Sequence, residues 1–488
     1  MNDFLAKLGN IKGYIEESLT SWKVPGLAVS IVKDGEVILA EGYGYKDFVN
    51  KRPMTPDSLL PIGSVSKSFT AMAAAILADE GKMDLDAPIN QYIPAFKMFD
   101  PVAGQNISAR DMLCHRSGMP RHDFMWAVGA DDAFTREEIV RRIRFLENNI
   151  QFREKTQYQN HMFTIVGRAI EMITGKTWEE FVKERIMSLL DMNNSNFDVA
   201  ESQKTLDFAL PHRLNKNKEI TPVDFLQLSS FRPAGGINST ANDMAKWMKL
   251  MQDKGLYKNT RIVSEDKITE MHTPHMHFKN TYSFEFPEIL FTSLGLGWIT
   301  EVYRGRKMVY HSGDVTGFTA LFAFLPEENF GVCTLANMES THVTYTVRNE
   351  IFDRFIGAAG GNWNARYKAE ADKSLMEAEE NKAEALKGRI KGTRPTLDFS
   401  AYVGEYEHPG YGLAVISENK ESPNSLKAMF NGREYMLEHF HYDQFILNVE
   451  IFNSELPLRF SIGRNGEIES FSVPFEPALE KDIVFKRK

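Results

Sequence analysis

Cysteine is nearly absent from this chain, and long apolar runs are absent altogether. Among 488 residues only Cys114 and Cys333 are cysteines, and they lie far apart in apolar or mixed stretches. This excludes a disulfide framework and leaves too few thiolates for a tetrahedral metal site. We expect both thiols to be buried as small apolar groups. No apolar run approaches the roughly 20 residues of a membrane-spanning helix, so no membrane span is expected.

A strong excess of charge of one sign is also missing. The net charge is -9 and no basic stripe stands out, so neither nucleic acid nor an anionic membrane is expected as a partner. Apolar residues make up 43% and charged residues 25%, as in an ordinary soluble globular protein. In residues 1–25 the apolar residues recur at helical spacing and charged residues lie between them. A secretory signal would have an uncharged apolar stretch instead, so we expect a cytoplasmic protein.

The order of helix and strand patterns predicts an α+β fold, an α/β sandwich. Asp34-Gly35 between two β-rich runs indicates a hairpin, and residues 64–81 are rich in helix formers. Further strands are indicated at 307–311, 319–326 and 330–337. Strands at both ends of a region with helices between them suggest an antiparallel sheet that distant segments close, with helices packed on it.

A second domain is indicated near the C-terminus. Residues 361–395 are charged, Ala-rich and helix-favouring, as in a solvated helix or linker. From 396 to 488 short runs of period two alternate with turn residues, which predicts a small sandwich or barrel. With a length beyond what one core serves, the expected domains are 1–360 and 396–488, joined by the linker.

Ser64 and Lys67 could form a nucleophile and its base. They stand at positions i and i+3 of an expected helix, where side chains lie on one face about 5–6 Å apart at Cβ. A serine at a helix N-terminus also lies among backbone N–H groups that have no helical partner. The alternative is that Ser64 only caps the helix and Lys67 lies at the surface.

Two further groups of polar residues could complete a site. Tyr158 and Asn160 are two positions apart and would point the same way in extended backbone, although Tyr158 could equally be a packing residue. His311-Ser312-Gly313 ends an apolar β-run, and a glycine in a strand allows close approach to the backbone. His311 could also be an ordinary histidine at a strand end.

Together these motifs resemble the class C β-lactamase, D,D-peptidase and esterase superfamily of penicillin-recognising serine enzymes, which also includes D-aminopeptidases. VPGLAVSIVKDGEV, DLDAPINQYIP, LCHRSGMPRHD and RPAGGINSTANDMAKWM also match, so the resemblance covers roughly residues 11–355. It implies a sheet flanked by helices with a mostly helical subdomain. Residues 400–488 resemble the lipocalin-like antiparallel β-barrel that some relatives carry, which either holds a small ligand or packs its own interior.

The resemblance also assigns roles to the candidate residues. It implies that Ser64 is the nucleophile, that Lys67 helps to deprotonate it, and that Tyr158 acts as general base and acid. Asn160 would contact the substrate amide. His311, Ser312 and Gly313 would line the substrate, and the backbone N–H groups of Ser64 and Asp314 would form the oxyanion hole.

One departure from the family pattern bears on the substrate. Where β-lactamases and D,D-peptidases have Lys-Thr-Gly, this chain has His311-Ser312-Gly313, and a histidine is mostly neutral at pH 7. We therefore expect a hydrolase of small esters or of amide or peptide bonds, with weak or no β-lactamase activity. Ester and amide substrates remain equally open. The alternative is a catalytically inactive member of this fold that binds or assembles.

No cofactor or metal is expected. His272, His275 and His277 cluster in the sequence, but no acid or cysteine stands beside them at ligand spacing. Gly235-Gly236 lacks the following Gly-Lys-Ser/Thr of a phosphate loop and fits a turn before a helix capped at Ser239 or Thr240. Asp123 and Asp314 are candidates for holding a substrate ammonium. The expected partner is a small ester, amide or peptide substrate, and a homo-oligomer is compatible with the resemblance.

Overall fold

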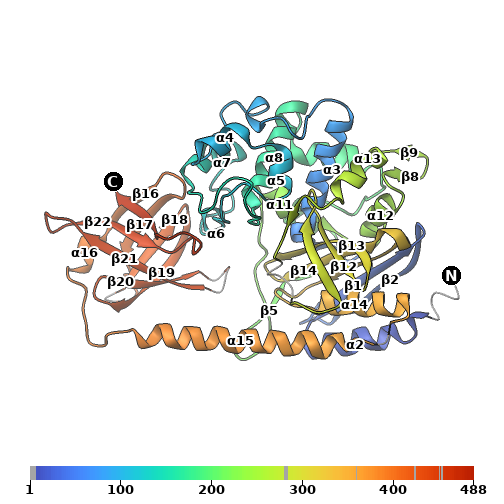
Figure 1. Cartoon of the computed structure of the whole chain (residues 1–488). Coiled ribbons are helices and arrows are strands. Elements are labelled where there is room, and N and C mark those ends of the chain that lie inside the picture. Colours follow the sequence, from blue (N-terminus) through green and yellow to red (C-terminus); the bar gives the residue numbers. More distant parts are fainter. Residues whose placement is uncertain (1–6, 280–283, 359, 423–424, 450, 452–453) are drawn as a thin grey trace. The chain divides into compact units, whose positions relative to one another are not determined.

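The chain forms two compact units, each assembled from segments that are distant in sequence (Figure 1). The computed structural model describes residues 7–279, 284–358, 360–422, 425–449, 451 and 454–488. One unit comprises Met1–Tyr92, Ser108–His115 and Met162–Lys373, and the other comprises Ile93–Ile107, Arg116–His161 and Ser374–Lys488. The domain boundaries expected at residues 360 and 395 remain a prediction.

An antiparallel sheet is the centre of the first unit. Its strand order is β10-β11-β12-β13-β14-β15-β1-β2-β3, so β1, near the N-terminus, pairs with β15 from the far end of the unit. This confirms the expected closure of the sheet by distant segments. The strands are β1 (Gly26–Lys33), β2 (Glu36–Asp47), β3 (Arg52–Pro53), β10 (Met276–His277), β11 (Ile289–Leu294), β12 (Ile299–Tyr303), β13 (Arg306–Val315), β14 (Phe318–Leu325) and β15 (Phe330–Ala336).

The hairpin predicted at Asp34-Gly35 joins β1 to β2. Both residues have positive φ, 51° at Asp34 and 72° at Gly35. Two consecutive left-handed residues form the kind of turn whose twist matches that of the flanking strands, and Asp-Gly is a favoured pair for it. The first hairpin of the sheet was therefore readable from local sequence.

Helices cover both faces of this sheet. On one face lie α2 (Ile11–Trp22) and α14 (Val343–Ile356), and on the other α12 (Ala241–Gln252) packs on β1 and β15, with α3 (Ser66–Asp79) beside it (Figure 1). The ring of Phe69 in α3 stacks on Trp247 of α12 at 4.0 Å between centroids. Burial of this ring pair makes α3 part of the core and so fixes the helix that carries Lys67.

Shorter elements complete the first unit. Its helical segments include η1 (Gly63–Val65), η2 (Ile89–Gln91), α5 (Ala109–Leu113), α9 (Trp178–Val182), η4 (Lys183–Met187), α10 (Val199–Ser202), α11 (Arg232–Gly235), α13 (Glu265–Met271) and η5 (Pro326–Glu328). Small strand pairs are β4 (Leu60–Pro61) with β7 (Asn238–Ser239), β5 (His212–Leu214) with β6 (Ile220–Pro222), and β8 (Leu256–Tyr257) with β9 (Thr260–Arg261). Of the two residues proposed from the sequence as the cap of α12, Ser239 and Thr240, it is Thr240 that caps the helix.

Two helices contribute to both units, α8 (Asn160–Thr174) and α15 (Trp363–Lys387). The first turns of α15 bury Trp363 and Tyr367 in the first unit. In the described ranges no helix has the length and apolar character needed to span a bilayer.

The second unit contains a closed antiparallel barrel. Its strands follow chain order from β16 to β23, and β16 pairs with β23 at Tyr406 and Arg487 to close it. They are β16 (Gly404–His408), β17 (Gly412–Glu418), β18 (Leu426–Phe430), β19 (Arg433–His441), β20 (Gln444–Val449), β21 (Ser454–Ile462), β22 (Ile468–Val473) and β23 (Ile483–Arg487). The helical segments of this unit are α4 (Pro101–Asn106), α6 (Phe124–Ala127), α7 (Arg136–Arg142), η3 (Ile143–Phe145) and α16 (Phe399–Tyr402).

Aromatic side chains fill the barrel interior. Phe471 stacks on Phe485 at 4.9 Å between ring centroids, and Phe430 and Phe460 meet these rings edge-on. All four are buried. Of the two alternatives left open by the sequence, the structure favours a barrel that packs its own interior.

Both cysteines are buried, as expected. Burial raises the pKa of the Cys333 thiol well above its ordinary value. A thiol kept protonated in this way is a poor nucleophile and acts as an apolar packing group.

We expect the protein to lose stability as the pH falls from 6.5 to about 5. Burial lowers the pKa of His161, His272 and His311 to about 3 and that of His122 to about 4. In the unfolded chain these groups titrate near pH 6.5. Below that pH the unfolded state binds more protons, so stability present above pH 6.5 declines by up to about 1.4 kcal/mol per group and pH unit.

The measurement is the thermal unfolding midpoint at pH 7.5, 6.5 and 5.5 at constant ionic strength. Asp314, Glu476 and Asp253 act in the opposite direction, because desolvation raises the pKa of each carboxyl group, that of Asp314 to about 6, but the neutral histidines outnumber them. The midpoint should therefore fall between pH 6.5 and 5.5. An equal or higher midpoint at pH 5.5 would contradict the neutral, buried state of these imidazoles.

Candidate active site

Ser64 lies in a single 3-10 turn ahead of α3. The turn η1 covers Gly63–Val65, and α3 begins at Ser66, two residues later than the sequence predicted. The reason is Gly63, whose φ of +51° places it in the left-handed region that glycine adopts most readily. Strand β4 precedes the turn and pairs with β7, which fixes the direction from which the chain enters.

Lys67 reaches Ser64 from the first turn of α3. Its Nζ donates to Ser64 Oγ at 2.9 Å and to the carbonyl oxygen of Ala234 at 2.6 Å. The amine also lies 5.5 Å from the centroid of the Phe163 ring. Lys67 is fully buried, so the interpretation that it is a surface residue is wrong. Ser64 accordingly has a buried amine within hydrogen-bonding distance.

The short helix α11 supplies the carbonyl group that accepts from Lys67. It packs against α3, where Thr70 Oγ1 donates to the Pro233 carbonyl at 2.6 Å. The sequence predicts only a turn at Gly235-Gly236 and does not indicate the role of the Ala234 carbonyl. A backbone acceptor leaves no side-chain signature, so only the surrounding RPAGG motif could have pointed to it.

Strand β13 runs directly against the turn that carries Ser64. A Cβ on Gly313 would lie 2.0 Å from the carbonyl oxygen of Ile62 and 2.8 Å from the Ser64 nitrogen. A Cβ on Gly63 would lie 3.0 Å from the Asp314 nitrogen. Gly313 is therefore needed for the close approach of η1 to β13. It brings the backbone nitrogens of Ser64 and Asp314 into one small region.

His311 is neutral at physiological pH. Burial, with the nearby charge of Lys67, lowers its pKa to about 3. Its Nδ1 lies 2.6 Å from the carbonyl oxygen of Ser312, which can only accept, so Nδ1 carries the proton. The environment strengthens the neutrality that the sequence already predicted for a histidine at this position.

The side chain of Asp314 points to the other face of β13. Side chains alternate along a strand, so Ser312 and Asp314 face away from His311 and Gly313. Asp314 Oδ1 accepts from Thr319 Oγ1 at 2.9 Å, and burial raises its pKa to about 6. Asp314 thus contributes its backbone to the region near Ser64, while its carboxyl group faces the opposite side of the sheet. This placement disfavours Asp314 as the partner of a substrate ammonium.

Tyr158 and Asn160 belong to the second unit, where they lie beside Arg121 and Asp123. Asn160 is the first residue of α8, and its Nδ2 donates to Asp123 Oδ1 at 2.9 Å. The Arg121 guanidinium lies 5.0 Å from the centroid of the half-buried Tyr158 ring. Asp123 was a candidate acid from the sequence, but nothing in the sequence indicated Arg121. Arg121 contacts Tyr158 although it lies 37 positions earlier in the chain.

Both carboxylate oxygens of Asp123 accept hydrogen bonds from neighbouring side chains. Its Oδ2 accepts from Arg121 Nε at 2.5 Å, and its Oδ1 also accepts from Trp126 Nε1 at 3.0 Å. Burial alone would raise its pKa, but the Arg121 charge and the bonds from Asn160 and Trp126 hold that pKa below its ordinary value. Its carboxylate therefore organises this loop, which leaves little capacity for a substrate ammonium.

Other polar residues singled out from the sequence have structural partners. His272 lies buried between the rings of Trp298 and Phe324, and His275 Nε2 is 3.1 Å from the Glu270 carbonyl oxygen. Arg232, the first residue of the RPAGG motif, pairs with Glu179 and Asp198. These contacts explain their presence without substrate.

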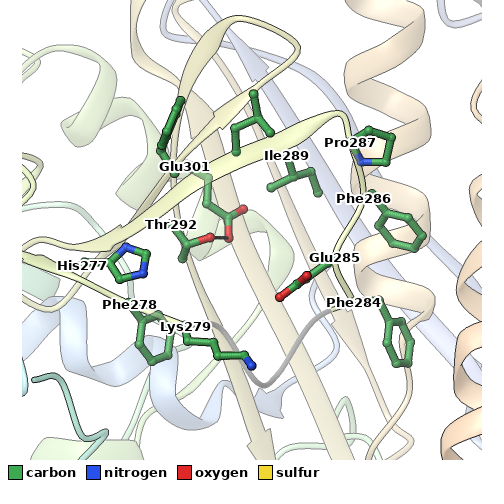
Figure 2. Close-up of a pocket in the computed structure, with 12 residues that line it drawn as sticks. His277, Phe278, Lys279, Phe284, Glu285, Phe286, Pro287, Ile289, Thr292 and Glu301 are labelled. Atoms are coloured by element: carbon green, nitrogen blue, oxygen red, sulfur yellow. Dashed lines mark hydrogen bonds between the residues drawn. The ribbon is translucent and has the colours of Figure 1, made fainter.

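A pocket of about 570 Å³ opens at the β10–β12 edge of the sheet, lined by none of the expected site residues (Figure 2). Its acid Glu301 accepts from Thr292 Oγ1 at 2.9 Å and from Tyr310 Oη at 2.8 Å. The Glu301 carboxylate is therefore hydrogen-bonded to side chains of the sheet itself. The pocket is lined by His277, Phe278, Lys279, Phe284, Glu285, Phe286, Pro287, Ile289, Leu290, Phe291, Thr292 and Glu301.

We expect Gly313→Ala to lower the rate of any ester hydrolysis that depends on Ser64 by about 100-fold or more. The added methyl group would force β13 away from η1, which costs about 1–3 kcal/mol and separates the two backbone nitrogens. Gly305→Ala is the control, since a Cβ there has no described neighbour within 4 Å although its φ is +78°. Ester hydrolysis and unfolding midpoints should be measured for both variants. Equal residual activity in the two would contradict this account of Gly313.

Comparisons with known proteins identify the family of this chain. A family profile described as Beta-lactamase matches residues 11–351, and one described as a Domain of unknown function (DUF3471) matches residues 388–487. The chain is 26% identical over 508 residues to "Unguisins hydrolase ungD'" of Aspergillus campestris (strain IBT 28561), covering 97% of this chain and 90% of that protein. It is 25% identical over 341 residues to "Protein flp" of Staphylococcus aureus (strain N315), covering 69% and 64%.

Among solved structures, the chain is similar to an octameric penicillin-binding protein homologue from Pyrococcus abyssi. The TM-score is 0.65 at 24% identity, and the match covers 98% of this chain and 100% of the other. This likeness confirms the expected fold, a sheet flanked by helices followed by an antiparallel barrel. Because the Beta-lactamase match spans well over half of the chain and includes Ser64 and Lys67, this protein belongs to the Beta-lactamase family.

Proposed function

We propose that this protein is a serine hydrolase that forms an acyl-enzyme on Ser64 and cleaves small esters or amide bonds. The observation that carries the proposal is the 2.9 Å distance between Lys67 Nζ and Ser64 Oγ, with Lys67 fully buried. Moving an ammonium out of water favours its neutral form, and a neutral amine can accept the hydroxyl proton. The Ala234 carbonyl holds the amine in place for that transfer.

In the proposed reaction, Ser64 Oγ forms a bond to the substrate carbonyl carbon while its proton passes to Lys67. The backbone N–H groups of Ser64 and Asp314 stabilise the negative charge that develops on the carbonyl oxygen. Loss of one such donor typically costs about 10²–10³ in rate. The bond to the leaving group then breaks, and the leaving group takes up a proton.

We assign this proton transfer to Tyr158. The phenol would protonate the departing alcohol or amine, and its phenolate would later take a proton from the water that hydrolyses the acyl-enzyme. Ser64 Oγ then leaves the acyl carbon and takes its proton back from Lys67. The guanidinium of Arg121 over the ring favours the anionic form between the two steps. Asn160, held by Asp123, is proposed to contact the substrate amide.

The substrate is proposed to be a small ester, amide or peptide rather than a β-lactam. A neutral His311 lacks the charge with which the lysine of the Lys-Thr-Gly motif would attract a substrate carboxylate. A relative named as a hydrolase supports hydrolysis as the reaction class. The octameric solved relative supports a homo-oligomer as a further proposal for this chain.

Initial rates on p-nitrophenyl butyrate, D-alanine p-nitroanilide and nitrocefin test the proposal. We expect turnover of the ester or the anilide, and hydrolysis of nitrocefin at least 100-fold slower in kcat/KM than that of the preferred substrate. Ser64→Ala should remove turnover of all three, because no other group supplies the acyl acceptor. The matched control is Ser68→Ala, which alters a buried serine whose hydroxyl donates to the Val65 carbonyl.

Turnover that survives in Ser64→Ala would overturn Ser64 as the nucleophile. Nitrocefin as the best of the three substrates would overturn the substrate class while leaving the nucleophile intact. Absence of turnover on all three, together with binding of an ester analogue, would favour an inactive member of the fold.

A further inference from the structure

The C-terminal barrel contacts the segment Arg116–His161 at several points within the second unit. Phe124 stacks on Phe475 at 5.0 Å, the Ala130 N–H donates to the Asn431 carbonyl, and Arg142 donates to the Pro409 carbonyl. This segment also carries Tyr158 and Asn160. The barrel therefore supports the stretch of chain to which the proposed proton carrier belongs.

Two barrel side chains converge on one residue of this segment, His122. Tyr411, between β16 and β17, has its hydroxyl 2.8 Å from His122 Nδ1. Glu476, between β22 and β23, accepts from the His122 backbone N–H at 2.6 Å through Oε2. Its Oε1 accepts from the Ala478 N–H at 3.1 Å, which fixes the carboxylate.

The direction of each bond to the His122 ring follows from its other partner. Nε2 lies 2.9 Å from the Glu147 carbonyl oxygen, which can only accept, so Nε2 carries the proton. Burial lowers the pKa of His122 to about 4, so the ring is neutral and Nδ1 is an acceptor. The Tyr411 hydroxyl therefore donates to Nδ1, and without it the fully buried lone pair would lose this donor.

The backbone at His122 adopts a conformation that the barrel contacts maintain. Its φ is +48°, in the left-handed region that is unfavourable for a residue with a Cβ. Such a conformation persists where surrounding contacts determine it. Here the N–H of the same residue is bonded to Glu476 and its ring to Tyr411.

Asp123, the next residue, connects His122 to the candidate catalytic residues through its hydrogen bonds. Its Oδ1 holds the Asn160 amide, and its Oδ2 holds Arg121, whose guanidinium covers the Tyr158 ring. Gln159, which lies between Tyr158 and Asn160 in the sequence, donates to the Pro120 carbonyl. A shift at His122 would therefore move the partners of both Tyr158 and Asn160.

We propose that Tyr411 and Glu476 of the barrel are positioning residues for Tyr158 and Asn160, acting through His122 and Asp123. This inference rests on the proposed function, in which Tyr158 protonates the leaving group. It gives the barrel a role in catalysis although its interior is filled with its own side chains.

The test compares Tyr411→Phe with Tyr406→Phe in the full-length protein. Tyr411→Phe removes only the hydroxyl that reaches His122, while the ring can still stack on Phe475. Tyr406→Phe is the matched control, since it removes a buried hydroxyl that donates to the Tyr402 carbonyl inside the barrel. Titration of active sites with a fluorophosphonate normalises the rates of both variants to folded, reactive chains.

The readout is kcat/KM for p-nitrophenyl butyrate and for ethyl butyrate. The alkoxide leaving group needs a proton far more than p-nitrophenolate does. We expect Tyr411→Phe to lower kcat/KM about tenfold for ethyl butyrate and less than threefold for p-nitrophenyl butyrate. Tyr406→Phe should leave the ratio of the two values at that of the wild type. Glu476→Ala should behave like Tyr411→Phe, whereas Glu476→Gln, which keeps an oxygen acceptor, should recover most of the rate.

Each outcome separates this inference from the proposed function. A wild-type protein that shows Ser64-dependent turnover, with the same substrate ratio in Tyr411→Phe as in Tyr406→Phe, overturns the inference alone. Absence of Ser64-dependent turnover in the wild type overturns both. If Tyr411→Phe does not fold, the Glu476→Ala and Glu476→Gln pair decides: equal substrate ratios in these two variants overturn the inference.

Discussion

Lys67 carries its amine into the interior of the α/β unit, and the arrangement around Ser64 depends on how that burial is compensated. A buried amine needs partners, and the structure gives it the Ser64 hydroxyl, the Ala234 carbonyl and the face of the Phe163 ring. Each partner comes from a different element, so η1, α11 and α8 are held together with α3 around one nitrogen. Removing an ammonium from water favours its neutral form, which is the form proposed here to take a proton from serine.

The second constraint is the close approach of two backbones. Strand β13 and the turn η1 meet at Gly313 and Gly63, where Cβ atoms would lie 2.0 to 3.0 Å from neighbouring backbone atoms. This approach places donors from Ser64 and Asp314 in one region without any side chain between them. His311 is neutral and the carboxyl group of Asp314 lies on the opposite face of β13, so neither side chain adds a charge beside Ser64. A neutral His311 offers no charge to a substrate carboxylate, which is the basis for the proposed preference for uncharged carbonyl compounds.

Much of this arrangement was predictable from sequence where the signal is local. Asp34-Gly35 predicted a hairpin, alternation predicted β13 to β15 and the barrel strands, and the i, i+3 spacing predicted that Lys67 would meet Ser64. The start of α3 was placed two residues early, because the left-handed φ of Gly63 depends on contact with β13. Backbone acceptors such as Ala234 and long-range neighbours such as Arg121 on Tyr158 have no local signature. The contact of Tyr411 and Glu476 with His122 joins positions about 290 and 354 residues apart, which no periodicity encodes.

Activation of Ser64 as a nucleophile by Lys67 is tested by the rate at which a fluorophosphonate labels the protein, followed by intact mass and by mapping of the labelled peptide. We expect one label per chain on Ser64, no label in Ser64→Ala, and labelling at least 100-fold slower in Lys67→Met, which keeps an apolar side chain of similar length. Labelling of another residue, or an unchanged rate in Lys67→Met, would contradict it.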